Sequence, residues 1–195
     1  MTAGVLLAAG ESRRMGRPKL LLPLRGRPLV RWTAEALVGA GLSPLVAVLG
    51  HRADEVREAL AGLELETILN PAYADGQATS LRAAVEALPA ACRTVAVALG
   101  DMPGVHAQTV RAVVAAFGAA GKGIARPVHA GRPGHPVVFD LTKYRAELLA
   151  LTGDEGARSL LVRHAEDVLE VPVEDPGVLV DVDTPEAYEA LIGHR

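Results

Sequence analysis

The chain has 195 residues, of which 50% are hydrophobic, 22% charged and 3% aromatic, and its formal net charge is −3. At roughly 150 residues per domain, this length favours one domain over residues 1–195, with a core large enough to fold without disulfides or a structural metal. Two Phe, three Tyr and one Trp are too few for a base-stacking nucleic-acid platform, and one Cys cannot form an internal disulfide or a thiolate zinc site. No apolar run approaches the ~18 residues of a membrane span, so we expect a reducing, cytoplasmic setting without membrane or nucleic-acid partners.

Apolar runs alternate with segments of helical periodicity along the chain. Runs that are apolar at every position, such as Val95–Leu99, are typical of strands covered on both faces. The alternation therefore predicts a three-layer α/β sandwich with a mostly parallel sheet. The predicted strands are Gly4–Ala8, Leu45–Leu49, Glu66–Leu69, Thr94–Leu99, Gly123–Pro127, Pro136–Phe139, Val168–Val173 and Val178–Val182. The predicted helices are Leu29–Ala40, Asp54–Leu60, Thr79–Leu88, His106–Ala120, Lys143–Leu151, Ala157–His164 and Pro185–Ile192.

The loop after the first predicted strand, Leu7–Lys19, is the richest in candidate residues, and ligands of α/β sheets bind beyond the carboxyl ends of strands. Small residues at positions 8–10 let backbone N–H groups approach phosphate oxygens, whose charge Arg13 and Lys19 could neutralise. The spacing of the loop matches neither a P-loop, nor a dinucleotide-binding glycine motif, nor a nucleophile elbow. Seven basic residues and one acid lie between Glu11 and Arg31, so a phosphate site, a solvated surface and a nucleic-acid patch remain open.

Carboxylates follow two later apolar segments. Asp101 comes directly after the predicted strand Thr94–Leu99, and Asp181 and Asp183 lie on one side of the extended segment before Pro185. Mg²⁺ usually takes one or two protein carboxylates and completes its octahedron with water and substrate phosphates. These aspartates could therefore hold a magnesium ion, whereas the alternative is that Asp183 or Thr184 caps the last helix, with Pro185 at its first position.

Three further loops carry polar residues in rigid surroundings. Gly76–Leu81 has Gln77 and Ser80 at a helix start, where an ordinary Ser/Thr cap is the alternative. Gly131–Val137 holds a histidine between glycine and proline, which either meets an anionic substrate or is structural. Gly153–Arg158 is either part of a site or only a helix start with acids in its first turn.

Taken in order, these segments resemble the MobA-like nucleotidyltransferases, and most closely the molybdenum cofactor cytidylyltransferase branch. The resemblance covers almost the whole chain and implies a Rossmann-related, GT-A-like fold. It also implies an enzyme that binds a nucleoside triphosphate and Mg²⁺ and transfers the nucleotidyl group to a phosphorylated acceptor, releasing pyrophosphate. The motifs that carry it are Leu7-Ala8-Ala9-Gly10-x-Ser12-x-Arg14-Met15-Gly16-x-x-Lys19, Gly100-Asp101-Met102-Pro103, Pro133-Gly134-His135-Pro136 and Asp181-Val182-Asp183-Thr184-Pro185.

The resemblance implies a role for each candidate residue. Lys19, Asp101 and Arg14 would serve catalysis, and Asp101 would bind Mg²⁺ with Asp183 or Asp181 as the second carboxylate. The residues implied in nucleotide binding are Leu7, Ala8, Ala9, Gly10, Ser12, Arg13, Lys19, Gly76, Gln77, Ser80, Gly100 and Asp101. The residues implied to face the acceptor are Arg132, His135, Asp154 and Arg158.

The resemblance also bears on the substrates. In the family, Leu-Ala-Ala-Gly goes with cytidylyl transfer and Leu-Ala-Gly-Gly with guanylyl transfer, so the Ala9 of this loop favours CTP. The expected reaction is CMP transfer to the phosphate of a molybdopterin-type cofactor, and this phosphate is itself the nucleophile. Two alternatives remain. The first is nucleotidyl transfer that uses GTP or that has another phosphorylated acceptor, such as a sugar phosphate. The second is a non-catalytic accessory protein that binds the cofactor and hands it to a molybdoenzyme.

Overall fold

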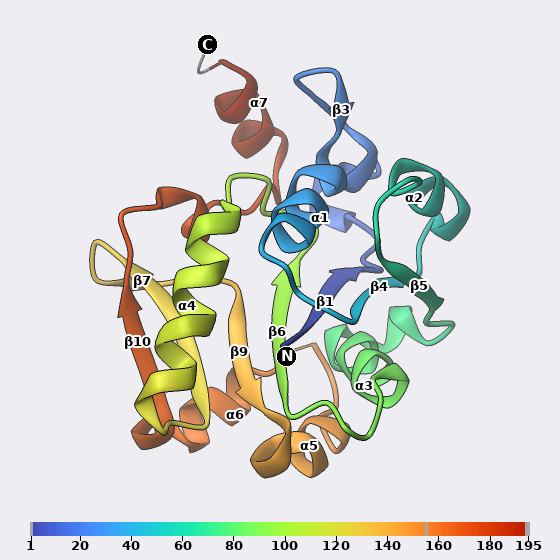
Figure 1. Ribbon diagram of the computed structural model, residues 1–195. Coiled ribbons are helices and arrows are strands. Elements are labelled where there is room, and N and C mark those ends of the chain that lie inside the picture. Colours follow the sequence, from blue (N-terminus) through green and yellow to red (C-terminus); the bar gives the residue numbers. More distant parts are fainter. Residues whose placement is uncertain (1, 155, 194–195) are drawn as a thin grey trace.

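The computed structural model describes residues 2–154 and 156–193, and its main feature is an eight-stranded sheet (Figure 1). A two-stranded ribbon, β2 (Pro23–Leu24) with β3 (Arg27–Pro28), lies outside this sheet. β8 (Arg132–Pro133) pairs with β7 (Ile124–His129) and lies beside the main path. The order along the main path is β10 (Val168–Pro172), β7 (Ile124–His129), β9 (Val137–Asp140), β6 (Thr94–Leu99), β1 (Ala3–Ala8), β4 (Leu45–Leu49) and β5 (Glu66–Leu69).

The sheet is mostly parallel, as expected, with β9 as the antiparallel strand between β6 and β7. β1 is the point at which the strand order reverses, because the chain continues from it to β4 and β5 on one side and returns to β6 on the other. In such sheets the carboxyl ends of the strands at the reversal diverge and leave a crevice. The topology therefore puts the loops after β1 and β6 beside one another.

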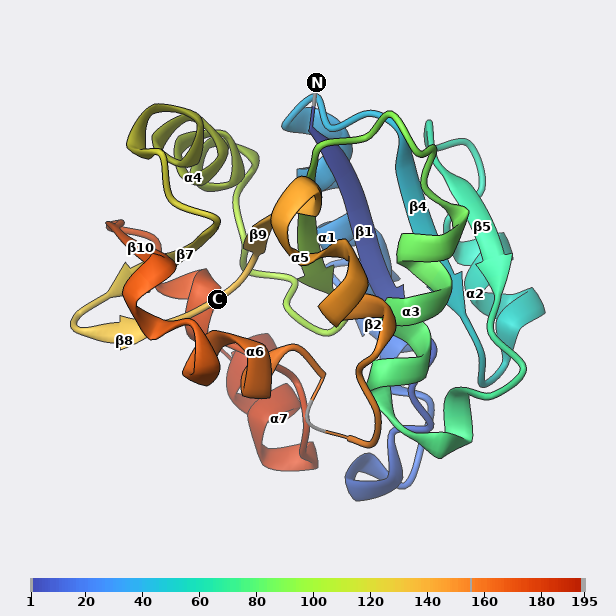
Figure 2. The same ribbon diagram turned by 90° about the horizontal axis from the view of Figure 1, so that it is seen from below.

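Helices cover both faces of the sheet (Figure 2). Successive strand residues alternate between faces, so Val5 of β1 joins one apolar cluster and Leu6 joins the other. Both side chains are fully buried, which contributes about 1.5–3 kcal/mol each. The Val5 face is covered by α3 (Gln77–Ala87), α5 (Leu141–Leu149) and α6 (Arg158–Arg163), and the Leu6 face by α1 (Leu29–Gly39), α2 (Ala53–Ala59) and α4 (Ala107–Ala120). The three-layer α/β sandwich is thus confirmed.

One predicted strand, Val178–Val182, is wrong. The chain there forms a 3₁₀ turn over Pro176–Leu179 and then runs without regular structure to α7 (Pro185–Gly193). Val178 and Val182 are buried but Val180 is 39% exposed, and the Asp175 side chain begins the turn by accepting a hydrogen bond from Gly177 N at 2.9 Å. The local side-chain bond and Pro176 replace the ladder that a strand would need.

The C-terminal helix closes over the N-terminal loop. Tyr188 of α7 packs with Met15 and Leu29 in a third apolar cluster, and its hydroxyl donates a hydrogen bond to Pro23 O at 2.6 Å. Two segments far apart in the sequence, the loop after β1 and the C-terminal helix, therefore pack against each other. No helix in the described ranges is long and apolar enough to cross a bilayer.

Candidate active site

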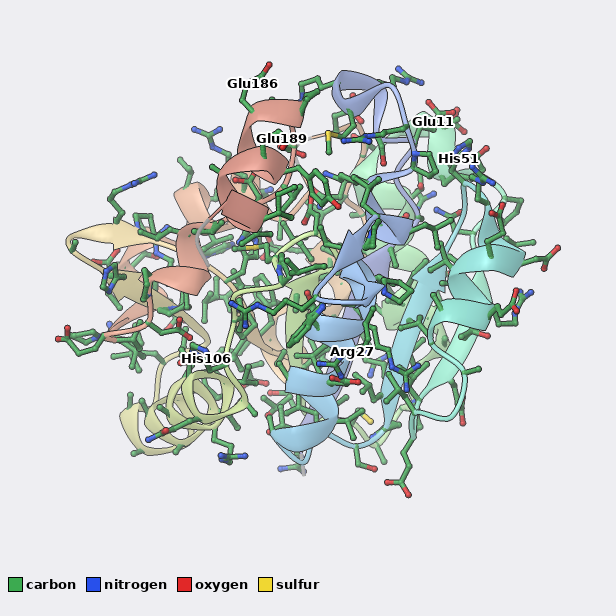
Figure 3. The ribbon with its side chains drawn as sticks, turned by 90° about the horizontal axis from the view of Figure 1, so that it is seen from above. Glu11, Arg27, His51, His106, Glu186 and Glu189 are labelled. Carbon is green, nitrogen blue, oxygen red and sulfur yellow. The ribbon has the colours of Figure 1, made fainter. Side chains whose placement is uncertain are left out.

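A cavity of about 460 Å³ lies at the carboxyl ends of β1 and β6, the crevice that the topology predicts. Figure 3 looks onto this edge of the sheet, with Glu11 beside His51 on one side and Glu186 and Glu189 of α7 on the other. The lining residues are Leu7, Ala8, Ala9, Gly10, Glu11, Arg13, Arg14, Lys19, Leu20, Tyr73, Ala74, Gly76, Gln77, Ser80, Leu99, Asp101, Asp154, Asp181 and Asp183. Most residues predicted to bind the nucleotide are thus brought together around one cavity.

The loop after β1 bends so that Lys19 points into this cavity. Ser12 has a left-handed backbone conformation (φ 58°), which costs a non-glycine residue about 1 kcal/mol, and Gly16 has φ 65° at the end of the 3₁₀ turn Arg13–Met15. The Ser12 hydroxyl accepts a hydrogen bond from Lys19 N at 3.2 Å and so fixes the base of the lysine. Ser12 itself does not line the cavity, and it acts through this bond.

Lys19 connects two carboxylates that are 82 and 164 residues away along the chain. Its Nζ donates hydrogen bonds to Asp101 Oδ2 and, at 2.5 Å, to Asp183 Oδ1. Arg14 donates to the other oxygen of Asp183 at 2.5 Å. The Lys19 side chain is only 12% exposed, so this ion-pair cluster is the charged floor of the cavity.

Charges around the floor shift several pKa values. Burial opposes the charged form of Lys19, but Asp101 and Asp183 outweigh it and raise the pKa of the ammonium. Burial likewise opposes ionisation of Asp183, yet hydrogen bonds from Lys19 and Asp181 hold its pKa below the ordinary value. Burial and the neighbouring Asp183 raise the pKa of Asp181. The carboxylates of Asp181 and Asp183 thus differ, with Asp183 the more readily ionised.

The donor set fits a divalent cation that arrives with phosphates. Asp101 Oδ1 is buried and has no hydrogen-bond partner, which is costly unless a cation or ligand completes it. Within residues 2–154 and 156–193, no group of three or more His, Cys, Asp or Glu could hold a metal alone. Mg²⁺ needs only one or two carboxylates when phosphates and water complete its shell, so Asp101 with Asp183 or Asp181 suits it.

The alternative role of Asp183 as a helix cap is not observed, because Thr184 Oγ1 accepts the hydrogen bond from Ala187 N at 3.3 Å. Asp183 is therefore free to face Lys19. A further backbone bond joins the two carboxylate loops, from Val182 N to Asp101 O at 2.9 Å.

The far wall of the cavity is the start of α3. Gly76 has φ 114°, and a Cβ on it would lie 2.4 Å from Gly153 O, so only glycine fits this contact. Ser80 Oγ accepts a hydrogen bond at 3.0 Å from the side-chain nitrogen of Asn70, which is 4% exposed. Since Asn70 is the donor, the Ser80 proton is free to point into the cavity. Asn70 was not among the residues predicted from the sequence, although its place directly after β5 is a signal that could have found it.

A second cavity of about 690 Å³ adjoins the first and shares Leu7, Gln77 and Leu99 with it. The titratable side chains among its lining residues are Arg126, His135 and Arg158. Burial lowers the pKa of His135, although Asp101 opposes the shift, so the imidazole is neutral at pH 7. Its other lining residues are Leu81, Val97, Pro133, Gly134, Val137, Phe139, Gly156, Ala157, Leu161, Val162 and Ala165.

The residues predicted to face the acceptor divide between the two cavities. His135 and Arg158 line the second cavity, Asp154 lines the first, and Arg132 is exposed on β8 and lines neither. The predicted segment 153–158 includes position 155, which lies outside the described residues. Gly100 lines neither cavity, but its N–H donates to Leu7 O at 2.9 Å and joins the two loops.

Arg126 of β7 is a residue that the sequence analysis missed. Its Nε is buried without a hydrogen-bond partner beside the second cavity, while its terminal nitrogen donates to Glu170 at 2.6 Å. The sequence gives little indication of a role for Arg126, because a single arginine in an apolar strand is typical of an ordinary strand at the edge of a sheet.

Comparison with known proteins agrees with this geometry. Residues 4–168 match the MobA-like NTP transferase domain. The chain is 36% identical to nicotine blue oxidoreductase of Paenarthrobacter nicotinovorans (97% of this chain, 95% of that protein) and 30% identical to the molybdenum cofactor cytidylyltransferase of Escherichia coli K12 (94% and 92%). Other relatives are bifunctional GlmU proteins, of whose length the matches span only 22–26%.

Among solved structures, the chain resembles Rv0371c of Mycobacterium tuberculosis H37Rv, with a TM-score of 0.87 and 33% identity over 98% of this chain and 97% of that one. A structure of Rv0371c in complex with manganese has a TM-score of 0.82 and 32% identity, covering 100% and 99% of the two chains. These likenesses confirm the expected GT-A-like fold.

Proposed function

The chain belongs to the MobA-like NTP transferase family and is a nucleotidyltransferase, and from this premise we propose that it transfers CMP from MgCTP to the phosphate of a molybdopterin-type acceptor. The observation that carries the proposal is the unpaired, buried Oδ1 of Asp101 beside Lys19 at the floor of the first cavity. A buried carboxylate oxygen without a partner, facing a basic loop, is what a metal–triphosphate complex requires.

The nucleotide lies in the first cavity. Backbone N–H groups of the Ala8–Gly10 segment approach the phosphates closely, and Arg13 and Lys19 neutralise their charge. The base and ribose lie against α3, where the Ser80 hydroxyl, with its oxygen held by Asn70, donates a hydrogen bond to the base. The methyl group of Ala9, which is 5% exposed, narrows the cavity at a place where a purine needs room, and this supports CTP.

The acceptor lies in the second cavity, which continues from the first through shared lining residues. Arg126 and Arg158 offer positive charge to its anionic group, and the neutral ring of His135 offers a hydrogen bond. The remaining walls are mainly apolar, which suits the flat body of a heterocycle more than a sugar.

The reaction needs orientation and charge neutralisation more than a protein nucleophile. An oxygen of the acceptor phosphate attacks the α-phosphorus of the nucleotide, the new P–O bond forms, and the bond to the departing pyrophosphate breaks. Mg²⁺ bound at Asp101 and Asp183 or Asp181 would neutralise phosphate charge. Lys19 and Arg14 stabilise the negative charge that grows on the pyrophosphate, and the two adjoining cavities hold the reactants in line.

Pyrophosphate release with each of the four NTPs, with and without molybdopterin, tests the proposal. We expect release to require the acceptor and a divalent cation, and kcat/KM for CTP to exceed that for GTP by about tenfold or more, roughly 1.4 kcal/mol. Equal rates with CTP and GTP would remove the base assignment. Release with a sugar phosphate but not with molybdopterin would assign a different acceptor, and no release with any acceptor would favour a cofactor-binding accessory.

A second candidate function follows from the relative with 36% identity, which is named as an oxidoreductase. Here the first cavity would hold a nicotinamide nucleotide and the apolar second cavity a flat coloured substrate. Hydride transfer needs no metal carboxylates, so Asp101 and Asp183 have no task in it, and we favour nucleotidyl transfer. Oxidation of NADH or NADPH by the purified protein in the presence of a quinonoid dye, without any release of pyrophosphate from CTP, would reverse that preference.

A further inference from the structure

The segment 175–183, called the strap from here on, connects β10 to α7 and carries both Asp181 and Asp183. Figure 1 shows it running from the end of β10 past the start of α4 to α7. Apart from the 3₁₀ turn Pro176–Leu179, it has no regular structure. A segment without a hydrogen-bonded ladder must be held by other contacts if it is to fix a carboxylate in place.

Asp175 anchors the strap at its first residue. The side chain is buried, and its Oδ2 accepts hydrogen bonds from Thr109 Oγ1 at 2.6 Å and from His106 N at 3.1 Å, while Oδ1 accepts from Gly177 N at 2.9 Å. His106 Nδ1 lies 3.2 Å from Oδ2 as well. Burial opposes ionisation, but these hydrogen bonds outweigh it and hold the pKa of Asp175 below its ordinary value. The strap is thus tied to the first turn of α4.

Three contacts link the anchored strap to the loops that line the two cavities. Gly177 packs so closely on Gly104 that a Cβ on Gly177 would lie 2.0 Å from Gly104 O. Val178 O accepts from His135 N at 3.0 Å. Further along the strap, the N–H of Val182 donates a hydrogen bond to the carbonyl of Asp101. Val182 stands between Asp181 and Asp183, so this bond ties the part of the strap that carries both carboxylates to Asp101.

We propose that Asp175 is a positioning residue that sets the place of Asp183 relative to Asp101 and so determines how tightly the metal–nucleotide complex binds. The inference rests on the proposed function, since it assigns a task to the strap in that same site. Asp175 lines neither cavity and touches no substrate, so it acts through the strap alone. Loosening it lets Asp183 drift from Asp101 and weakens the contacts of Asp183 with Lys19 and Arg14, while Asp101 and the bond between Lys19 and Asp101 keep their places.

The chain offers a matched control for this anchor. Asp167 is a half-buried aspartate that, like the buried Asp175, accepts hydrogen bonds from a hydroxyl and a backbone N–H, here Tyr144 at 2.7 Å and Gly123 at 3.0 Å. It joins the start of β10 to α5 and β7 and lines neither cavity. Asp167→Asn and Tyr144→Phe therefore remove bonds of the same kind at a place away from the strap.

The experiment measures the binding of Mn²⁺ in the presence of CTP by electron paramagnetic resonance, together with the unfolding temperature and the KM and kcat for pyrophosphate release. We expect Asp175→Asn and Thr109→Val to weaken Mn²⁺ binding by about tenfold and to raise KM for the metal–nucleotide more than they lower kcat. Asp167→Asn and Tyr144→Phe should lower the unfolding temperature comparably and change Mn²⁺ binding less than twofold.

Equal Mn²⁺ affinity in the strap variants and the control variants would overturn the inference and leave Asp175 a structural anchor only. If Asp175→Asn does not fold, Thr109→Val decides, because it removes one donor and keeps the carboxylate. A wild-type protein that binds no Mn²⁺ with any NTP would instead defeat the proposed function itself, so the two failures are distinguishable.

Discussion

Replacing Lys19 by Met tests the charge balance of the cavity floor. The Lys19 ammonium contacts one oxygen of Asp101 and one of Asp183, and the side chains of the three residues are 12%, 15% and 24% exposed. Two oxygens that contact one nitrogen lie at most about 5 Å apart, so at an effective dielectric of 20 their repulsion costs ~3 kcal/mol once the ammonium is removed. We expect the free energy of unfolding of Lys19→Met, without metal, to fall by about this amount.

The same variant should respond to a cation more strongly than the wild-type protein. Mn²⁺ between Asp101 and Asp183 would take over the neutralising task of Lys19, and a ligand at ~100 times its dissociation constant stabilises a folded protein by ~2.7 kcal/mol. Urea unfolding with and without Mn²⁺, both without nucleotide, measures this. Lys19→Met should regain most of its lost stability, whereas the wild-type protein, whose lysine already neutralises the pair, should gain less.

Arg14→Met is the matched control, because Arg14 also pairs with Asp183 but its side chain is 72% exposed. An exposed pair contributes less than about 1 kcal/mol, so this variant should lose little stability and gain little from Mn²⁺. The reasoning is refuted if Lys19→Met is as stable as the wild-type protein without metal, or if Arg14→Met costs as much.

Four other outcomes are expected. Asp101→Asn should reduce pyrophosphate release roughly 1,000-fold while the protein still folds, because Asn keeps the shape of the side chain and Asp183 still pairs with Lys19, but the charge that would bind the metal is lost. Ala9→Gly should lower the CTP-to-GTP ratio of kcat/KM about tenfold, and Ser80→Ala should raise KM for CTP about three- to tenfold through one lost hydrogen bond. Burial and the bond to Asp167 raise the pKa of Tyr144, so the folded state holds this proton more tightly than the unfolded one. The stability from that pair is complete below pH ~10 and is lost as the pH rises further, and urea unfolding between about pH 9 and 11 should lose this dependence in Tyr144→Phe.

Most strands and helices could be predicted because their signals are local. Thr94–Leu99 is apolar at nearly every position and lies in the middle of the sheet, where both faces are covered. The strap misled the prediction because its alternating valines mimic a strand, while the buried contact of Asp175 with Thr109, 66 residues earlier, decides the conformation. A bond over that separation leaves no local trace in the sequence.

The residues of the candidate site that have a local signal could be predicted from the sequence, and those that depend on contacts made by the fold could not. Asp101 directly follows a strand and Lys19 lies in the loop after β1, places where ligands of α/β sheets bind, so the local sequence is enough to make both of them candidates. Asn70 lies behind the first cavity and Arg126 lines the second, and the importance of each depends on which side chains the fold brings against it. Arg132 is a residue that the sequence suggested and the fold leaves out. Its neighbours in the sequence suggest a binding loop, but its position on β8 puts it outside both cavities.

The distribution of charge ties these points together. The segment from Glu11 to Arg31 is strongly basic, whereas Asp101 and Asp183 come from distant acidic parts of the chain. Without a ligand the two halves neutralise each other through Lys19, so neither the triphosphate nor the cation meets a free, fully charged site. A cation alone must displace an ammonium, and a triphosphate alone must draw Lys19 from its carboxylates. On the proposed function, binding both together would remove both costs at once, since phosphates would take the lysine and the cation the aspartates, so we expect the floor to favour a metal–nucleotide complex over either component alone.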